Sequence, residues 1–549
     1  MKNPADSFRS PSRRNLLKSG LLAGAAAALP PAHGSASTSS AAAPPVPAFE
    51  FEEMGAAELQ AKMKSGELTA RKLAEAYLAR IEAIDQNGPT LKAVIQTNPD
   101  ALKIADELDR ERKERGPRGP LHGLPVLIKD NIATADSMET TAGSLALVGS
   151  KPPKDSFVAK KLRDAGAIIL GKTNCSEWAN IRSGHSTSGW SGRGGQTKNP
   201  YALDRNPCGS SSGSGSGVSA NLSALSIGTE TNGSIVCPSS INGVVGIKPT
   251  VGLWSRAGII PISHSQDTAG PMCRTVRDAA TLLGAVTGVD PDDKYTAASA
   301  GKSHTDYTKF LDPNGARGMR IGVARHFFGF SEKVDPIIEA QLDVLKKLGA
   351  VIVDPADITT GREMGKHELT VLLYELKADL NAYLAWLGPN TPVKTLADII
   401  AFNERNREKE MPYFGQDTFL DAQKKGPLTD KEYIDGLAAN HKFSREEGID
   451  AVMDKYKLDA IVAPTAPPAW PTDLINGDAD SGGSSGPAAI AGYPNITVPA
   501  GFVFGMPTGI SFFGRAWSEP MLIKIAYAYE QATNHRKAPK FLPTADLSV

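Results

Sequence analysis

The chain has 549 residues, of which 41% are hydrophobic and 22% are charged, so it carries enough apolar material for a large buried core. Its 60 basic and 60 acidic side chains cancel, which excludes the strong net field that draws proteins to nucleic acid or to an anionic membrane surface. We therefore expect a globular protein whose partner is a small or peptidic molecule.

The first residues of the chain predict an export signal. Arg13 and Arg14 precede an apolar run over residues 21–29, and small residues follow it. This order is typical of a twin-arginine signal peptide, and the run is shorter than the ~20 residues that a membrane span needs. We expect a signal peptide over residues 1–36 and a disordered linker rich in Ser, Ala and Pro over residues 37–48. The protein would then be exported to the periplasm or the extracellular space, without stable membrane association once the signal is removed.

Helical and strand-like segments follow the linker. Apolar residues at helical spacing predict two helices between Leu59 and Ile81, with Thr69 capping the second, and a third helix over residues 100–112. Short apolar runs rich in β-branched residues then alternate with helical stretches, at residues 124–128, 167–170, 224–227, 321–323, 350–353 and 460–462. This alternation predicts an α/β fold whose sheet is covered by helices on both faces.

Residues 49–543 are predicted to form a single domain with a peripheral addition. Residues 361–448 have mostly helical character, and we expect them to elaborate the edge of the domain. The polar segment 291–314 predicts a loop, and the Gly/Ser stretch 477–486 predicts a mobile loop. Residues 544–549 are expected to be a C-terminal tail.

The cysteines and histidines give no sign of a disulfide framework or a metal site. Cys175, Cys208, Cys237 and Cys273 are far apart and form no C-x-x-C pair, so we interpret them as free, buried thiols. The nine histidines are scattered and none belongs to an H-E-x-x-H pattern. We expect no metal and no cofactor.

Three short motifs match known signatures without the structural context that each requires. Residues 166–173 spell a phosphate-binding loop, but the middle of the motif is a predicted buried strand. Residues 209–213 spell a nucleophile elbow, but Asn206 and Pro207 stand where the preceding strand should be. Residues 299–302 spell the β-lactamase S-x-x-K motif, but its S-D-N and K-T-G partners do not occur in the chain.

Two segments rich in glycine and serine, residues 207–215 and 228–238, are more informative. Taken alone, such segments are usually flexible linkers. Here the neighbouring residues 218–227 and 241–249 are apolar, and linkers are not normally embedded in core sequence. Glycines at such positions let successive main-chain N–H groups point at one spot, which is what an oxyanion site requires.

At these residues the chain closely resembles the amidase signature family. The resemblance covers most of residues 49–543 and includes the two serine blocks together with three further blocks in the family's order, at residues 122–131, 171–178 and 491–499. It implies a large mixed, mostly parallel, twisted sheet flanked by helices. It also implies a serine hydrolase that cleaves carboxamide bonds through an acyl-enzyme.

The same resemblance assigns a Ser-Ser-Lys triad. Lys129 would be the base, Ser210, after a cis bond to Gly209, the proton relay, and Ser234 the nucleophile. The oxyanion donors would be the main-chain N–H groups of Thr231, Asn232, Gly233 and Ser234. The chemistry agrees, because a serine hydroxyl is a poor nucleophile until a base takes its proton. Since free lysine has a pKa near 10.4, the base must be buried, and Lys129 directly follows the apolar run 124–128.

Several residues depart from the general family pattern without removing a triad member: Cys208, Ser212, Glu230, Asn232 and Val236. Cys208, the triple serine, Glu230 and the stretch 189–197 resemble the bacterial peptide amidases more than other branches. That resemblance implies a small peptide amide as substrate and a free acid and ammonia as products.

Three other functions remain open. Another branch of the family would act on aryl, fatty-acid or small aliphatic amides. A subunit of a transamidating complex fits less well, because such a subunit works in the cytoplasm and this chain carries the export pattern. A non-catalytic exported binding protein on the same scaffold is the alternative from a different class.

Overall fold

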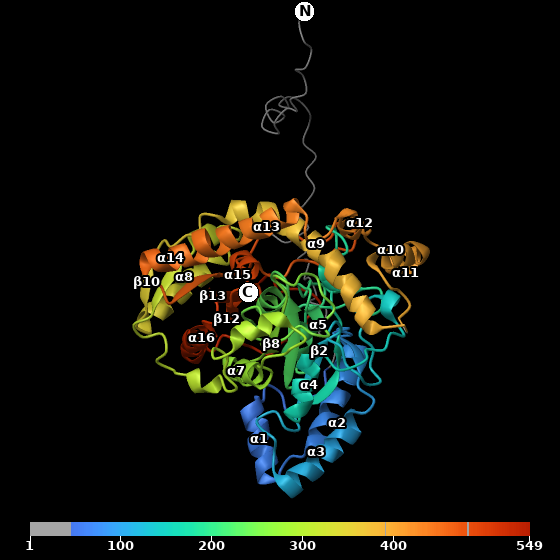
Figure 1. The fold of residues 1–549 in the computed structure, drawn as a ribbon. Helices are drawn as coiled ribbons and strands as arrows, with labels where there is room; N and C mark the ends of the chain where they lie inside the picture. The colour runs from blue at the N-terminus through green and yellow to red at the C-terminus, as the bar shows by residue number, and fades with distance from the viewer. Residues whose placement is uncertain (1–45, 390, 480–481, 549) are drawn as a thin grey trace, which may run out of the picture. The chain divides into compact units, whose positions relative to one another are not determined.

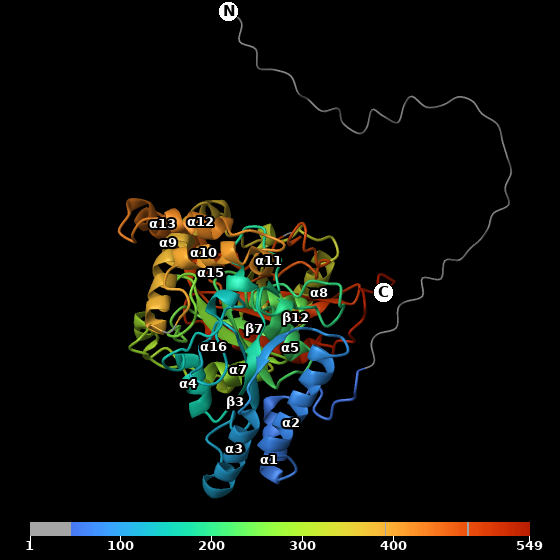
Figure 2. The same cartoon turned by 90° about the vertical axis from the view of Figure 1, so that its right-hand side faces the viewer.

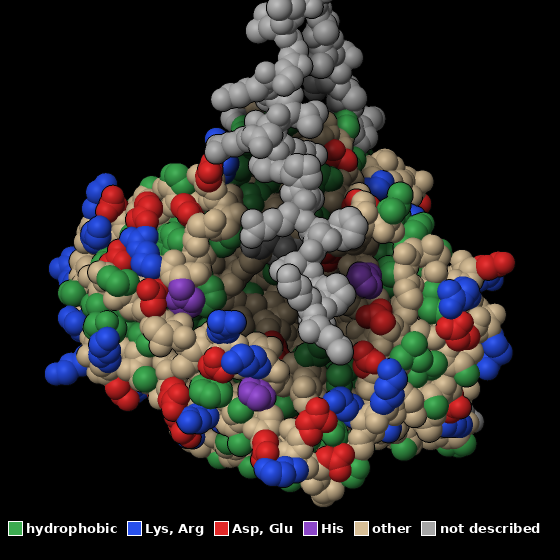
Figure 3. Space-filling model, turned by 90° about the horizontal axis from the view of Figure 1, so that it is seen from above, with side chains coloured by type: hydrophobic (Ala, Val, Ile, Leu, Met, Phe, Trp, Pro, Cys, Tyr) green, Lys and Arg blue, Asp and Glu red, His purple; other side chains and the backbone are tan. Residues whose placement is uncertain are grey.

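The computed structural model describes residues 46–389, 391–479 and 482–548, which belong to one compact unit (Figure 1). The predicted signal peptide and residues 37–45 of the predicted linker lie outside the described residues. Within the described part of the chain, no helix combines the length and apolar character needed to cross a membrane. On the face in Figure 3, acidic and basic side chains are interspersed, in agreement with the balanced charge of the sequence.

An eleven-stranded sheet forms the centre of the unit, in the order β1-β3-β2-β6-β8-β7-β12-β13-β11-β9-β10. Its strands are β1 (Val94–Thr97), β2 (Pro125–Lys129), β3 (Ile168–Thr173), β6 (Leu225–Glu230), β7 (Val245–Lys248), β8 (Thr268–Cys273), β9 (Arg320–Val323), β10 (Val351–Val353), β11 (Ala460–Pro464), β12 (Asn495–Val503) and β13 (Met506–Phe513). A separate hairpin pairs β4 (Trp190–Ser191) with β5 (Gly195–Gln196). All six strands predicted from the apolar runs are confirmed, as β2, β3, β6, β9, β10 and β11.

The mixed α/β class is confirmed, but the sheet is less parallel than expected. Neighbouring strands are parallel on the two flanks, in the pairs β3–β2, β2–β6, β11–β9 and β9–β10. The middle of the sheet, from β6 to β11, and the edge strand β1 pair antiparallel. Part of the reason is the hairpin of β12 and β13, whose connection is Phe504 and Gly505, with φ of 49° and 73°. Two successive positive φ values are the signature of a tight hairpin turn, which can join only antiparallel strands.

The predicted N-terminal helices are confirmed as α1 (Ala56–Ser65), α2 (Ala70–Ile81) and α3 (Ala101–Arg115). Thr69 caps α2 as expected, since its side chain accepts a hydrogen bond of 3.0 Å from the main-chain N–H of Lys72. Figures 1 and 2 show these three helices together at the β1–β3 side of the sheet. A further helix there, α4 (Phe157–Asp164), packs on β3.

Two groups of helices cover the middle of the sheet. The short helices α5 (Ser212–Ser219) and α6 (Val236–Ile241) contact each other and the central strands. The second group consists of α7 (Val276–Ala285), α8 (Asp335–Lys347) and α16 (Glu519–Thr533), whose apolar side chains enter the main core. The helices α14 (Asp450–Tyr456) and α15 (Gly486–Ala491) lie near the β11 side.

Residues 361–389 and 391–449 are mostly helical (orange in Figure 1). They form α9 (Gly361–Leu387), α10 (Leu396–Arg405), α11 (Arg407–Glu410), α12 (Asp417–Lys424), α13 (Lys431–His441) and the π-helical segment Lys442–Ile449. The long helix α9 buries Leu376, Leu380 and Leu384, a stripe at helical spacing, against Phe419 of α12 and Trp178. This packing holds α9 against the loops that surround the serine blocks.

Candidate active site

The site begins where two neighbouring parallel strands end. Strands β2 and β6 pair in parallel, with Ile128 opposite Ile227. Because the carboxyl ends of parallel strands meet at the same edge of a sheet, the next residues of the two strands are brought together there. Lys129 Nζ donates to Thr229 Oγ1 at 2.9 Å and to the Thr229 carbonyl oxygen at 3.3 Å. The amine of Lys129 is therefore fixed in position.

The structure brings Lys129 and Ser210 into contact. Ser210 lies in the loop before α5, its bond to Gly209 is cis as the resemblance implies, and its Oγ is 2.7 Å from Lys129 Nζ. Both side chains are fully buried. Burial lowers the pKa of Lys129 to about 8, because the charged ammonium is poorly solvated there. A large fraction of the amine is thus neutral near pH 8, as a base requires.

Ser234 lies in the loop between β6 and α6, beside a set of free main-chain donors. Within the described residues, the N–H groups of Thr231, Asn232, Gly233 and Ser234 have no protein acceptor. The next two N–H groups along the chain, those of Ile235 and Val236, donate to one carboxylate oxygen of Glu230, at 2.7 and 3.0 Å. Gly233 has a φ of 82°, which favours glycine and turns the chain into α6. The arrangement is that of an anion-binding loop, with Glu230 capping the helix behind it.

The two serine blocks are in contact, although the predicted proton relay lacks one direct hydrogen bond. The main-chain N–H of Ser211 donates to the Ser234 carbonyl oxygen at 3.2 Å, so Ser210 is next to a residue that contacts the predicted nucleophile. The part of the chain that the structure describes contains no hydrogen bond between the Ser210 and Ser234 side chains. Ser234 retains 8% of its surface exposed, while Ser210 is fully buried. Catalytic hydrogen bonds are often long in unliganded enzymes and tighten when substrate binds.

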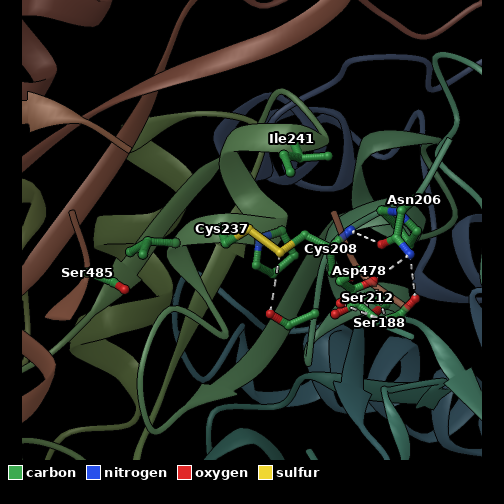
Figure 4. Close-up of a disulfide and its surroundings, with 12 residues drawn as sticks. Ser188, Asn206, Cys208, Ser212, Cys237, Ile241, Asp478 and Ser485 are labelled. Atoms are coloured by element: carbon green, nitrogen blue, oxygen red, sulfur yellow. Dashed lines mark hydrogen bonds between the residues drawn. A yellow bond between two sulfur atoms is a disulfide. The ribbon is translucent and has the colours of Figure 1, made fainter. Parts of the chain in front are cut away.

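The prediction of four free thiols is wrong for two of them. Cys208 and Cys237 form a disulfide with Cα atoms 6.2 Å apart (Figure 4). The two residues are 29 positions apart in sequence, and only the packing of α6 against the first serine block brings them together. Cys175 and Cys273 are free and buried. Burial raises the pKa of Cys175 to about 12, so this thiol is unreactive at neutral pH.

A cavity of about 510 Å³ opens beside Ser234. Its walls include Gly209 and residues 231–234 from the two serine blocks, the disulfide, and side chains that the sequence analysis did not single out. Those side chains come from α9 and from residues 465–485: Glu368, Leu369, Leu372, Trp470, Asp478 and Ser485. No motif marks them, because they reach the cavity only through the packing of distant segments.

One cluster has the composition of a metal site but is already occupied by protein partners. Ligand atoms of His264, Glu375 and Asp379 lie within 4.8 Å of one another. His264 Nδ1 is 2.8 Å from an Asp379 oxygen, and the Tyr433 hydroxyl donates to Glu375 at 2.8 Å. The other Glu375 oxygen accepts two bonds from Ser265, at 2.9 and 3.1 Å. We interpret the cluster as a hydrogen-bond network that fastens α9 to the loop at residues 262–267.

Comparison with known proteins identifies the family of the chain and several relatives. The amidase family model matches residues 72–523. A probable amidase of Arabidopsis thaliana is 45% identical over 505 residues, which cover 90% of this chain and 93% of the relative. The crystal structure of native peptide amidase from Stenotrophomonas maltophilia is similar with a TM-score of 0.86 and 51% identity, over 90% of this chain and 100% of that one. A structure of the peptide amidase PAM with the competitive inhibitor chymostatin also has 51% identity and a TM-score of 0.87, over 89% of this chain and 100% of that one.

Proposed function

The chain belongs to the amidase signature family and is an amide hydrolase, and we propose that Ser234, Ser210 and Lys129 carry its chemistry. The observation that carries the proposal is the bond of 2.7 Å between Lys129 Nζ and Ser210 Oγ in a buried position. A lysine with a pKa of about 8 next to a serine is poised to take a proton from a hydroxyl.

In the proposed mechanism, Ser234 Oγ attacks the amide carbon while its proton passes to Ser210, whose own proton passes to neutral Lys129. The oxyanion of the tetrahedral intermediate accepts hydrogen bonds from the free N–H groups of residues 231–234. The relay then returns the proton to the leaving nitrogen, ammonia departs, and an acyl-enzyme remains on Ser234. Water attacks the ester by the same relay in the same order, giving the carboxylic acid and free enzyme.

We propose the C-terminal amide of short peptides as the substrate. Two solved structures at 51% identity are of peptide amidases, and one of them holds a competitive inhibitor. The cavity beside Ser234, at about 510 Å³, has the size of a site for a small molecule or short peptide. Its walls contain several polar groups, which suit a peptide backbone better than an acyl chain.

Ammonia release from a panel of amides tests this function. Purified protein is given a dipeptide amide, a fatty amide and an acyl anilide, the anilide being followed through the released aniline. We expect turnover of the dipeptide amide. Reaction with the anilide or the fatty amide alone would place the chain in another branch of the family. A fluorophosphonate probe distinguishes the binding-protein alternative, because it should label Ser234 in an enzyme and nothing in a binding module.

We also propose that the protein acts outside the cytoplasm. The predicted signal at residues 1–36 supports this, and so does the Cys208–Cys237 disulfide, since stable disulfides are rare in reducing compartments. Cell fractionation of the wild type against a variant with Arg13→Lys and Arg14→Lys is the test. We expect the variant to accumulate inside the cell, and equal distribution of the two proteins would contradict the proposal.

A further inference from the structure

Glu368 is a carboxylate that the helical addition places at the wall of the active-site cavity. It lies near the start of α9 and is half-buried. Its Oε1 accepts two hydrogen bonds from neutral amides, from Asn232 Nδ2 at 2.7 Å and from Gln266 Nε2 at 3.0 Å. Asn232 is one of the residues that offer a free N–H beside Ser234, so Glu368 contacts the anion-binding loop directly.

The second oxygen of this carboxylate is available. Within the described residues, Glu368 Oε2 has neither a hydrogen bond nor an ion pair with the protein. The nearest lysine along the same helix, Lys366, already pairs with Glu363 at 2.6 Å. One oxygen is thus held in place by two donors while the other faces its surroundings without a protein partner. A fixed carboxylate of this kind binds a cation with little loss of side-chain freedom.

The charged side chains that line the cavity also favour a cation as the ligand. Among the described lining residues there is no lysine, arginine or histidine, and the only charged side chains are Glu368 and Asp478. Asp478 accepts hydrogen bonds from the main-chain N–H of Ser188 at 3.0 Å and from Trp470 Nε1 at 3.3 Å. Glu368 therefore gives its side of the cavity a negative charge, which attracts cations and repels anions.

We propose that Glu368 is a specificity-determining residue that binds the α-ammonium of a short peptide amide. The inference rests on the proposed function. In such a substrate the ammonium lies only a few bonds from the scissile carbonyl, and Glu368 lies one side chain away from the loop that would hold the oxyanion of that carbonyl. An N-acylated amide lacks the cation and loses this contact. An amide with a carboxylate at the same place is repelled by the negative charge of Glu368.

Three substrates that differ only at the amino group provide the test. They are glycyl-phenylalanine amide, its N-acetyl form and its N-succinyl form, each assayed for ammonia release at pH 7, where the α-ammonium is mostly charged. We expect the wild type to show its lowest KM for the free ammonium form and its highest for the succinyl form. Raising the salt concentration should reduce the difference in KM between these two substrates.

The variant Glu368→Gln removes the charge and keeps an oxygen that accepts from Asn232 and Gln266. Because Glu368 is half-exposed, we expect KM for the ammonium substrate to rise roughly five-fold, and KM for the N-acetyl substrate to rise much less. The matched control is Glu363→Gln on the same helix, which breaks the exposed pair with Lys366 and should change neither KM.

Two results would overturn the inference. If Glu368→Gln weakens both substrates equally, the carboxylate acts by holding Asn232 and not by binding the substrate. If the wild type hydrolyses the acetyl and ammonium forms with the same KM, there is no ammonium site, and the proposed function still stands. Failure of the wild type to release ammonia from any of the three would instead count against the proposed function.

Discussion

The disulfide between Cys208 and Cys237 joins the residue before Gly209-Ser210 to the first turn of helix α6, which follows Ser234. Ser210, the proposed relay, and Ser234, the proposed nucleophile, therefore lie on two segments that are covalently joined close to both residues. Figure 4 shows the bond between these segments, with Asn206, Ser188 and Asp478 beside it. The Asn206 side chain accepts a hydrogen bond of 2.7 Å from the main-chain N–H of Cys208 and so fixes one end of the tie.

Removing the disulfide should destabilise the protein. For the double variant Cys208→Ala/Cys237→Ala we expect the free energy of unfolding to fall by about 3 kcal/mol, because the unfolded chain gains the freedom of a loop of this length. Denaturant titration of the wild type and the variant measures the change. Reductant should lower the stability of the wild type towards that of the variant and leave the variant unaffected. Equal stability of oxidised wild type and variant would show that the bond does not stabilise the fold.

Substitution of the nucleophile should separate activity from stability. Ser234→Ala should reduce ammonia release at least ~10³-fold, since no other group can form the acyl-enzyme. The Ser234 side chain makes no hydrogen bond within the described residues, so we expect the free energy of unfolding to change by less than ~0.5 kcal/mol. Steady-state kinetics and thermal melting check the two halves. Turnover at the wild-type rate in the folded variant would refute the assignment of Ser234.

Activity should increase with pH around the titration of Lys129. Burial lowers its pKa to about 8, and the base works only when it is neutral, so kcat/KM should rise through about pH 8 and then level off. Lys248 provides a matched control, because it is equally buried, its pKa is also lowered by burial to about 8, and within the described residues its amine makes no hydrogen bond to a serine. Lys129→Met should abolish activity, whereas Lys248→Met should keep the wild-type pH profile. A profile that shifts in the Lys248 variant would contradict the assignment of the base.

The burial of Lys129 should also lower the free energy of unfolding. The pKa of Lys129 is about 8 when folded and about 10.4 in the unfolded chain, so the unfolded state binds the proton more tightly. The penalty is fully present below pH 8 and disappears as the pH rises towards 10.4. Lys129→Met should therefore be more stable than the wild type at pH 7, with a difference that shrinks above pH 8. Denaturant titrations at pH 7 and pH 9.5 measure the difference in the free energy of unfolding between the variant and the wild type. A difference that grows with pH would show that burial of the charged lysine does not destabilise the fold.

The network around His264 should stabilise the docking of α9 at acidic pH. Burial lowers the pKa of His264, but the hydrogen bond to Asp379 and the charge of Glu375 outweigh it, so the pKa is raised. A raised folded-state pKa stabilises the fold below the unfolded value of about 6.5, and the effect is lost as the pH rises through the folded pKa. His264→Asn should thus accelerate amide hydrogen exchange in α9 relative to the wild type. The acceleration should be larger at pH 6 than at pH 8. Equal protection of α9 in both proteins at pH 6 would rule out this role.

Some parts of this structure are readable from the sequence because they depend on local pattern. The strand before Lys129 is a continuous apolar run, and the cap at Thr69 needs only the residues that follow it. Strand β8 is not among the predicted strands, because it contains Gly270 and Pro271, which weaken the strand pattern. These two residues fit into a strand here only because of the surrounding tertiary structure. Local pattern therefore identifies elements best where a single strand or helix carries its own signal.

Other features depend on contacts between distant segments. The pairing of Cys208 with Cys237 and the approach of Glu368 to Asn232 arise from packing, which no single segment records. Burial alone does not identify the base either, since Lys129, Lys172 and Lys248 all have a pKa lowered to about 8 by burial. The bond to Ser210 singles out Lys129.

The proposed catalytic residues and the cavity-lining residues of the long helix α9 lie on different elements, which affects how the substrate specificity of such a protein can change. None of the three proposed catalytic residues lies on α9, yet Glu368, Leu369 and Leu372 of that helix line the cavity. Substitutions on this one helix can therefore retune which amide is accepted while the bond-breaking apparatus is left intact. New substrate preferences can thus arise without a substitution at any of the three proposed catalytic residues.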